Sequence, residues 1–482
     1  MSSILKEICT RVLKEVTPEP GERQRLQDLT LRLIKKTETS AKENNLEVSV
    51  RLEGSLAKDT WLSSDVDIDL FIGFSPEVGR KRFEKVALEI ARKVAEGHEQ
   101  KERFAEHPYL EARIEGTRIN LVPFYKISSD RAKRSDWMSA TDRTPYHTEF
   151  IKKNLGDSLK GDVRLLKRFM KGIGVYGAEI RVGGFSGYLC ELLTLHYGSF
   201  IKVLEAIAAS GEMITLDYMK SYRNGDDLQK FFSSNFIVVD PVDRRRNVAS
   251  SVSSRKLNEF RAASRIFLKS PRERFFFPGI TQPFGPDGVM STMDGKGTDI
   301  IFIKIGGAGV VSDILWGQLY KTLRSIERYL RQNDFQVLRS SAWSDEANCS
   351  LLVFELERNL LSMTKKHLGP PISKIKESAD FLEKYLGSKE LVAGLWIEDN
   401  RWVAQIRRRS MDARVLLERK VKNGGRDIGV GSFIAEAAMR DLEIFVNEEI
   451  LDFLSSSRDF AIFLTDFLYG RPRWLESDRG NT

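Results

Sequence analysis

Three aspartates alternate with aliphatic residues in the stretch DVDIDLF, residues 65–71. Successive side chains of a β-strand point to opposite faces, so we expect Asp65, Asp67 and Asp69 to share one face while the aliphatic residues enter the core. Carboxylates at alternate positions can hold a pair of divalent cations, as in two-metal phosphoryl-transfer sites. The alternative interpretation is an exposed edge strand on which charge discourages aggregation.

A short turn upstream favours the chemical interpretation. Gly54-Ser55 opens a predicted helical turn, and Lys58 follows three residues after the serine. A glycine turn that opens a helix exposes backbone N–H groups, which can cradle phosphates. A nucleoside triphosphate needs both a phosphate cradle and a cation clamp, so the two features together predict metal-dependent nucleotidyl transfer.

The composition indicates a soluble protein of several domains with a polyanionic partner. The 482 residues are 41% hydrophobic, and 76 Lys plus Arg outnumber 68 acidic residues to give a net charge of +8. Basic clusters such as Arg407-Arg408-Arg409 suit a phosphate backbone, although any one cluster is equally consistent with a solvated face. Three separated cysteines, with no CxxC, no signal-peptide pattern and no long apolar run, predict a cytoplasmic protein without a membrane segment.

The hydrophobic pattern up to about residue 140 predicts a small α/β domain that would position these residues. The expected elements are helices over 3–15, 21–45 and 77–96, strands over 46–52 and 66–74, and a hairpin over 108–125 that turns at Glu115-Gly116-Thr117.

The pattern from about 142 to 275 is helical, with Asp162 and Ser186 as predicted N-caps. The Gly- and Pro-rich stretch 277–297 is expected to be the exit from this region. A long amphipathic helix capped by Ser312 and later strand-helix-strand segments predict one or two α+β modules.

The Gly-Ser turn and Asp67-x-Asp69 resemble the signature of the DNA polymerase β-like nucleotidyltransferase superfamily. Later segments closely resemble the archaeal-type, class I CCA-adding tRNA nucleotidyltransferases: TDRTPYHTEF, DVRLLKRFMKGIGVYGAE, GGFSGYLCELL, VVDPVDRRRNVA and LWGQLYKTLR. The matches extend from about Arg51 to Arg324. The resemblance implies Mg²⁺-dependent addition of C, C and A to the 3′ end of tRNA from CTP and ATP, without a nucleic-acid template.

The resemblance also implies the fold class, α/β plus α, and its division into four domains. These are a catalytic head with a mixed sheet, a helical neck that selects the nucleotide, and an α+β body and tail that bind tRNA. The expected ranges are 1–141 for the head, 142–276 for the neck, 277–345 and 430–482 for the body, and 346–429 for the tail.

The resemblance also implies roles for individual residues of this chain, wherever they match a motif of the family. Asp67 and Asp69 would hold the metal ions. Arg407, Arg408 and Arg409 lie beyond these motifs and are candidate RNA contacts because they form a basic cluster. The implied nucleotide-binding residues are Gly54, Ser55, Lys58, Thr144, His147, Lys167, Tyr176 and Arg246, the last of which would read the incoming base. Four of them have structural alternatives: His147 as a core histidine, Lys167 as surface charge, Tyr176 as packing, and Arg246 as part of a general RNA-binding cluster.

One position departs from the family pattern. The family carries a third catalytic carboxylate on a later strand, where this chain has Asn120 in INLVP. An asparagine offers a carbonyl oxygen to a metal, but it brings no charge and cannot accept the proton of an attacking 3′-hydroxyl. Three explanations stay open: an inactivated variant, a natural enzyme with another base, and a homologue that only binds RNA. Glu111 and Glu115 on the predicted hairpin are candidate replacements, and the sequence favours neither.

Two rival functions and the oligomeric state also stay open. A poly(A) polymerase or oligoadenylate synthase shares the Gly-Ser and Asp-x-Asp elements, and a noncatalytic tRNA-binding protein would share the basic clusters. The bacterial-type CCA enzyme fits less well, because its arginine-aspartate base-reading motif is missing from the sequence. A homodimer is among the assemblies that the sequence allows.

Overall fold

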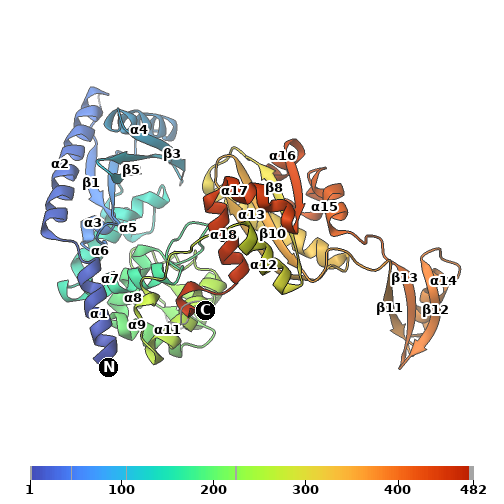
Figure 1. Ribbon diagram of the computed structural model, residues 1–482. Helices are drawn as coiled ribbons and strands as arrows, with labels where there is room; N and C mark the ends of the chain where they lie inside the picture. Colours follow the sequence, from blue (N-terminus) through green and yellow to red (C-terminus); the bar gives the residue numbers. More distant parts are fainter. Residues whose placement is uncertain (1–2, 45, 105, 223–224, 477–482) are drawn as a thin grey trace. The chain divides into compact units, whose positions relative to one another are not determined.

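The computed structural model of the chain describes residues 3–44, 46–104, 106–222 and 225–476. Contacts divide the chain into two compact units. Unit 1 comprises Met1–Gly279 and Pro472–Thr482, and unit 2 comprises Ile280–Arg471. Unit 1 therefore contains the predicted head and neck, and unit 2 contains the tail and most of the body (Figure 1). The division into four domains stays a prediction.

The head carries a five-stranded mixed sheet in the order β1-β2-β5-β4-β3. Strands β2 and β5 pair in parallel, and the other neighbours pair antiparallel. The strands are β1 (Ser49–Glu53), β2 (Asp67–Phe74), β3 (Glu99–Phe104), β4 (Pro108–Ile114) and β5 (Thr117–Tyr125). The predicted hairpin is confirmed, with positive φ at Glu115 and Gly116 in its turn. Strand β3 was not predicted, because its sequence EQKERF has no apolar alternation.

The head sheet has one apolar face and one polar face. Aliphatic residues of β2, β4 and β5 join a single hydrophobic core with α2 (Pro20–Glu43) and α4 (Arg80–Val94). The alternate residues of β2 and β5 place Asp67, Asp69 and Asn120 on the opposite face. Two short helices complete the head, α3 (Gly54–Lys58) and α5 (Ser129–Lys133).

The neck is helical and is built around a core rich in phenylalanine. The N-terminal helix α1 (Ser3–Val16) also contributes to this core. The other elements of the neck are α6 (Thr144–Asn154), α7 (Asp157–Gly172), α8 (Gly187–Tyr197), α9 (Phe200–Ala209), α10 (Gly225–Phe232), α11 (Ser254–Lys269), and the parallel pair β6 (Ile214–Leu216) and β7 (Phe236–Val238).

The neck confirms one predicted helix cap and corrects another. The Ser186 hydroxyl accepts a hydrogen bond from the Leu189 backbone N–H and caps α8 as predicted. The prediction for Asp162 was wrong, because α7 begins five residues earlier and Gly156 is its N-cap. The Asp162 carboxylate instead accepts a hydrogen bond from the Phe200 backbone N–H at the start of α9, at 2.8 Å.

Unit 2 contains an antiparallel sheet in the order β14-β8-β10-β9 and a separate three-stranded sheet in the order β11-β13-β12. The first sheet consists of β8 (Asp299–Gly306), β9 (Val337–Ser344), β10 (Cys349–Leu356) and β14 (Leu442–Val446), and the second of β11 (Thr364–Pro371), β12 (Leu391–Glu398) and β13 (Arg401–Arg407). The helices are α12 (Pro286–Lys296), α13 (Ser312–Gln332), α14 (Ile375–Tyr385), α15 (Ala413–Val421), α16 (Ser432–Arg440), α17 (Leu451–Ser456) and α18 (Arg458–Tyr469).

Two expectations for unit 2 were wrong in detail. Ser312 is the first residue of α13 and Val311 is its N-cap, with no side-chain hydrogen bond. Helix α12 begins at Pro286, inside the stretch that was expected to be only a connection. Proline suits the first turn of a helix, because the N–H that it lacks has no intrahelical partner there.

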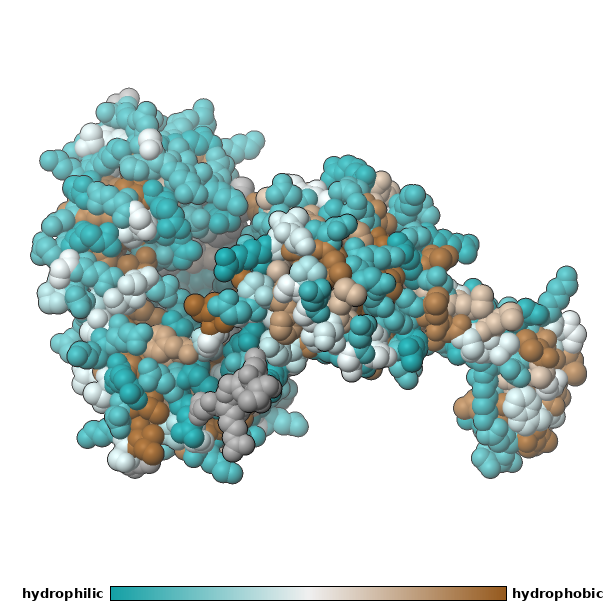
Figure 2. Space-filling model, viewed as in Figure 1, coloured by the Kyte–Doolittle hydropathy of each residue, from teal (hydrophilic) through white to brown (hydrophobic). Residues whose placement is uncertain are grey.

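Hydrophilic residues cover most of the visible face of unit 1 (Figure 2). Within the described residues, no single helix is long and apolar enough to cross a membrane. The pair α8 and α9, bent by 90°, meets that criterion by length and composition only when the two helices are taken together.

Candidate active site

The carboxylates of β2 face two side chains of β5. The parallel register places Asp67 opposite Arg118 and Asp69 opposite Asn120. Arg118 donates from Nε to Asp67 Oδ1 at 2.7 Å and from its terminal nitrogen to Asp67 Oδ2. Asn120 Nδ2 donates to Asp69 Oδ1 at 2.8 Å. The prediction that Asp67, Asp69 and Asn120 lie together is therefore consistent with the geometry.

Asp65 does not belong to this group. It precedes β2, and its carboxylate forms an ion pair with Lys171 of α7 at 2.6 Å. The expectation that three aspartates share one strand face was thus wrong for the first of them. Two carboxylates, rather than three, line the polar face of β2.

The electrostatics of Asp69 differ from those of an exposed acid. Burial raises the pKa of the Asp69 carboxyl to about 6, and the nearby charge of Asp67 adds to the rise, while the hydrogen bond from Asn120 opposes it. At neutral pH the surroundings of Asp69 therefore do not fully stabilise its negative charge, and a bound cation would do so.

Gly54 lies directly against Asp69. It adopts φ of 71°, and a Cβ placed on it would be 2.0 Å from Asp69 Oδ2. Only glycine combines this left-handed conformation with such a close approach. The backbone of the predicted phosphate cradle, which continues through Ser55 in α3, is thus in contact with the predicted cation ligand.

Lys58, at the end of α3, is buried and points toward the neck. Its Nζ donates to Glu191 Oε2 of α8 at 2.5 Å. Lys167 of α7 is also buried, and its Nζ donates to the Thr60 carbonyl oxygen at 3.0 Å and to Glu191 Oε1 at 3.3 Å. Burial alone raises the pKa of the Glu191 carboxyl, but Lys58 and Lys167 together hold it below its ordinary value. Glu191 therefore joins two predicted nucleotide-binding lysines.

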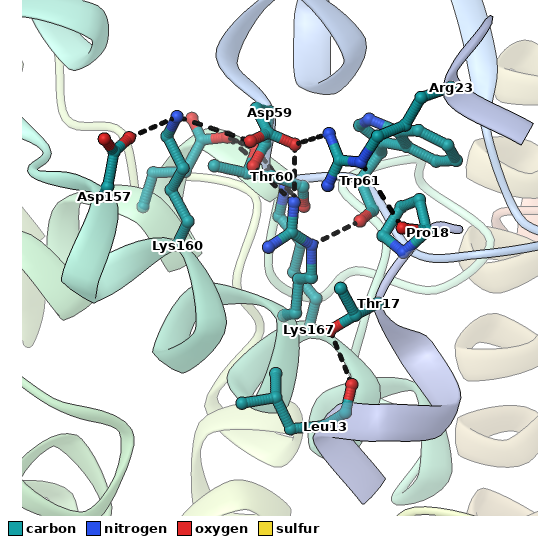
Figure 3. A network of polar contacts seen from close by, with 12 residues as sticks. Leu13, Thr17, Pro18, Arg23, Asp59, Thr60, Trp61, Asp157, Lys160 and Lys167 are labelled. Atoms are coloured by element: carbon teal, nitrogen blue, oxygen red, sulfur yellow. Dashed lines mark hydrogen bonds and ion pairs between the residues drawn. The ribbon is translucent and has the colours of Figure 1, made fainter. Parts of the chain in front are cut away.

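A second polar network fixes the segment between α3 and β2 to the neck (Figure 3). Asp59 accepts hydrogen bonds from Arg23 at 2.7 Å, from Arg164 at 2.6 Å and from Lys160 at 3.3 Å. Arg164 also donates to the Trp61 carbonyl oxygen at 3.0 Å. Because these partners come from α2 and α7, the network holds Lys58 in place between the head and the neck.

Asp240 contacts two of the predicted nucleotide-binding residues, His147 and Arg246. His147 Nε2 of α6 lies 2.8 Å from Asp240 Oδ2, and a terminal nitrogen of Arg246 donates to the same oxygen at 2.8 Å. Tyr188 stacks on the His147 ring at 4.2 Å between centroids and donates to Asp240 Oδ1 at 3.2 Å. Lys58 Nζ lies 5.6 Å from the centre of the Tyr188 ring, so this cluster adjoins the one at Glu191.

The charges of this cluster follow from its burial. Burial lowers the pKa of the His147 imidazole, which favours the neutral ring. Burial alone raises the pKa of the Asp240 carboxyl, but His147 and Arg246 outweigh it and hold that pKa below its ordinary value. Arg246 is the permanent cation of the pair, and its side chain is 34% exposed.

Two further predicted residues lie near these clusters. Tyr176 is half-buried, and the ammonium of Lys171 lies 4.8 Å from the centre of its ring. A Cβ on Gly187 would be 3.0 Å from the Tyr176 hydroxyl, which places the tyrosine at the start of α8. Thr144 is the first residue of α6, one turn before His147.

The three candidate RNA contacts belong to unit 2. Arg407 and Arg409 are exposed at the end of β13, whereas Arg408 is half-buried and forms an ion pair with Asp334 at 2.7 Å. The charge of Arg408 is thus already paired with a carboxylate inside unit 2, which weakens its candidacy as an RNA contact.

The donor set at β2 fits a hard divalent cation. Mg²⁺ is commonly held by one or two carboxylates together with substrate phosphates, and Asp67 and Asp69 supply the carboxylates beside the Gly54 backbone. Over the described part of the chain, no group of three or more His, Cys, Asp or Glu side chains could hold a metal ion by itself. The substrate phosphates would therefore have to complete the coordination.

Comparison with known proteins identifies the family. Family models match for a nucleotidyltransferase domain over residues 34–147, the second domain of tRNA nucleotidyltransferases over 161–277, and the C-terminal domain of CCA-adding enzymes over 296–447. A solved structure of a cytoplasmic RNA terminal U-transferase aligns with a TM-score of 0.44 at 14% identity, over 56% of this chain and 96% of that chain.

Curated relatives match nearly the full chain. The CCA-adding enzyme of Methanosarcina mazei is 34% identical over 465 residues, which cover 96% of this chain and 98% of that protein. The CCA-adding enzyme of Halobacterium salinarum is 34% identical over 453 residues, which cover 90% and 96%. Because this similarity extends across the head, the neck and unit 2 alike, the chain belongs to the family of CCA-adding enzymes.

Proposed function

We propose that the chain adds C, C and A in turn to the 3′ end of tRNA, with CTP and ATP as nucleotide donors and Mg²⁺ as the cation. Membership of the CCA-adding enzyme family supports the overall activity. The observation that carries the chemistry is the contact between the Gly54 backbone and the Asp69 carboxylate. A phosphate cradle that adjoins a cation ligand suits a metal-bound triphosphate.

In this reaction the 3′-hydroxyl oxygen of the tRNA attacks the α-phosphorus of the nucleotide, a new phosphorus–oxygen bond forms, and the bond to the departing pyrophosphate breaks. We assign the triphosphate to Gly54, Ser55 and Lys58, and the cation to Asp67 and Asp69. When bound, the cation supplies positive charge to the phosphates and lowers the pKa of the attacking hydroxyl. Lys58 has three donors, so it can bind a phosphate while it keeps its bond to Glu191.

The cluster around Asp240 is our candidate for nucleotide selection. C and A share an exocyclic amino group beside a ring nitrogen acceptor, whereas U and G carry a carbonyl oxygen and an N–H at the corresponding edge. Arg246 is held by Asp240 through one terminal nitrogen, and its remaining N–H groups are available to donate to a ring acceptor. His147, at the same oxygen as Arg246, and Tyr188, at the other oxygen, also hold Asp240 in position.

Arg407 and Arg409 are proposed contacts to the tRNA backbone. Both arginines are exposed, Arg407 as the last residue of β13 and Arg409 just beyond it, and backbone binding by such residues weakens as salt concentration rises. We expect replacement of both by alanine to weaken tRNA binding and to reduce its salt dependence, and replacement of Arg408 to affect both properties less.

The test is incorporation of labelled CTP and ATP, with Mg²⁺, into tRNA that ends before CCA. Wild type, Asn120→Asp and Asp69→Ala would be assayed side by side, the last as the inactive reference. We expect wild type to add CCA and Asn120→Asp to add it about tenfold faster or more, because a third carboxylate would be restored. Equal rates for wild type and Asn120→Asp would mean that a third acid is dispensable in this chain.

A noncatalytic tRNA-binding role is the second candidate, and one observation favours it. Asn120 donates its amide N–H to Asp69 and so occupies an oxygen that a cation would use. That role predicts tRNA affinity without incorporation by either wild type or Asn120→Asp. Acceptance of CTP, rather than ATP alone, would separate CCA addition from a poly(A) polymerase-like activity.

A further inference from the structure

Arg118 makes a contact that the proposed function does not use. Its guanidinium spans both oxygens of Asp67, because the parallel pairing of β2 and β5 puts the two residues opposite each other. Arg118 donates both hydrogen bonds, and its guanidinium stays charged because arginine does not deprotonate in proteins. The Arg118 side chain is 51% exposed, and it reaches Asp67 from the neighbouring strand.

The side chains of β5 already occupy most of the carboxylate oxygens. Arg118 takes Asp67 Oδ1 and Oδ2, and Asn120 takes Asp69 Oδ1. The remaining oxygen, Asp69 Oδ2, faces Gly54, where the triphosphate is expected. A cation can therefore reach Asp69 together with the phosphates, whereas a second cation at Asp67 must displace a bidentate guanidinium.

The summed charge of the side chains around the two carboxylates leads to the same conclusion. Three carboxylates would give a charge of −3, but Asp67, Asp69 and Arg118 sum to −1 because Asn120 is neutral and the arginine is positive. A second divalent cation beside a fixed guanidinium would meet like-charge repulsion in a partly desolvated site. The neutral Asn120 and the positive Arg118 therefore act in the same direction and reduce the capacity for divalent cations.

We propose that the Arg118 guanidinium fills one of the two cation positions at the carboxylate pair, so that the head binds one divalent cation per chain where a three-carboxylate head would hold two. The inference rests on the proposed metal-dependent function. In this arrangement Arg118 is a positioning residue that neutralises Asp67 and keeps its carboxylate oriented. Unlike a metal ion, this positive charge cannot leave the site with the pyrophosphate.

The test counts bound Mn²⁺ rather than activity. The full-length protein would be dialysed against Mn²⁺ and a non-hydrolysable CTP analogue, and the ratio of bound Mn²⁺ to bound analogue would be measured. We expect one Mn²⁺ per analogue for wild type and two for Arg118→Gln. Arg113→Gln is the matched control, because Arg113 is the cross-strand neighbour of Arg118 on β4, one strand farther from Asp67, and it should leave the count at one.

Several outcomes would overturn the proposal. Two Mn²⁺ ions on wild type would do so without any variant, and so would a single ion on Arg118→Gln. Arg118→Lys, which keeps the charge, should stay at one ion, and a count of two would show that charge is not what excludes the second cation. Absence of Mn²⁺ from every variant, Asn120→Asp included, would overturn the metal assignment itself, whereas CCA incorporation with an unexpected count would overturn only the role of Arg118.

Discussion

The carboxylates of the neck and those of the head are neutralised in different ways. Glu191 and Asp240 are buried, and cationic or hydrogen-bonding side chains from several helices and loops surround them, so the pKa of each carboxyl is held below its ordinary value. In the head, burial raises the pKa of the Asp69 carboxyl to about 6. The neck is thus electrostatically complete, in the sense that protein side chains neutralise its buried carboxylates without a ligand. In the head, by contrast, a substrate-bound cation would supply the positive charge that Asp69 lacks.

The largest effect should follow from removal of the central charge of the neck. Glu191→Gln would leave Lys58 and Lys167 buried without a counter-ion, and we expect a loss of about 3–5 kcal/mol in the free energy of unfolding. Urea denaturation checks this value. The control is Glu149→Gln, which removes an exposed partner of Arg51 and should cost less than about 1 kcal/mol. Similar losses for both variants would contradict the view that the neck is electrostatically complete.

A smaller effect is expected in the head, where replacement of a carboxylate should raise the free energy of unfolding rather than lower it. The pKa of the Asp69 carboxyl is about 6 in the folded chain against an ordinary value of 3.8, so the folded state binds the proton more tightly than the unfolded state. Stability without a divalent cation should therefore fall as pH rises from about 4 to about 6. Asp69→Asn should remove this penalty and gain up to about 3 kcal/mol at pH 7.

Urea denaturation of wild type and Asp69→Asn in EDTA, at pH 4 and pH 7, measures this difference. Mn²⁺ should stabilise wild type at pH 7 and leave Asp69→Asn nearly unchanged. If Asp69→Asn were less stable than wild type at pH 7 in EDTA, the head would not depend on an added cation as we describe.

The smallest effect concerns nucleotide choice in the neck. Asp240→Asn would weaken the hold on Arg246 and His147, and we expect the preference for CTP over UTP, as a ratio of kcat/KM, to fall about tenfold, or about 1.4 kcal/mol. Asp243→Asn is the control, because the Asp243 carboxylate pairs with Arg143, whereas the Arg246 guanidinium pairs with Asp240. An unchanged preference in Asp240→Asn would restrict this cluster to a structural role.

Local patterns in the sequence predicted the strands of the head other than β3, because the alternation of aliphatic and polar residues in β2, β4 and β5 reflects a sheet with one buried face. The same pattern predicted the position of Asp67 and Asp69. It could not predict Arg118 as the partner of Asp67, because the two lie 51 residues apart and their register depends on how β2 and β5 pair.

The neck shows a similar limit. Glu191 was missed although it is the one acidic residue of α8, an otherwise apolar helix, and a charge in that setting indicates a buried partner. Asp240 was missed as well, and its signal was weaker, since an aspartate before proline is typical of a turn. Both acids lie next to residues that the resemblance did indicate, so the family pattern predicted the cations of the site but not the carboxylates that hold them.

The bond from Lys58 to Glu191 joins residues that are 133 positions apart. During synthesis the head sheet can form from local segments long before α8 has left the ribosome, and until then Lys58 stays hydrated. Closure of so long a loop is a late, entropically costly step in folding. A truncated head that ends near residue 141 would therefore keep its strands but lack the anchor of its phosphate-binding lysine, so a chain cut short at that point would be folded in part and without nucleotide affinity.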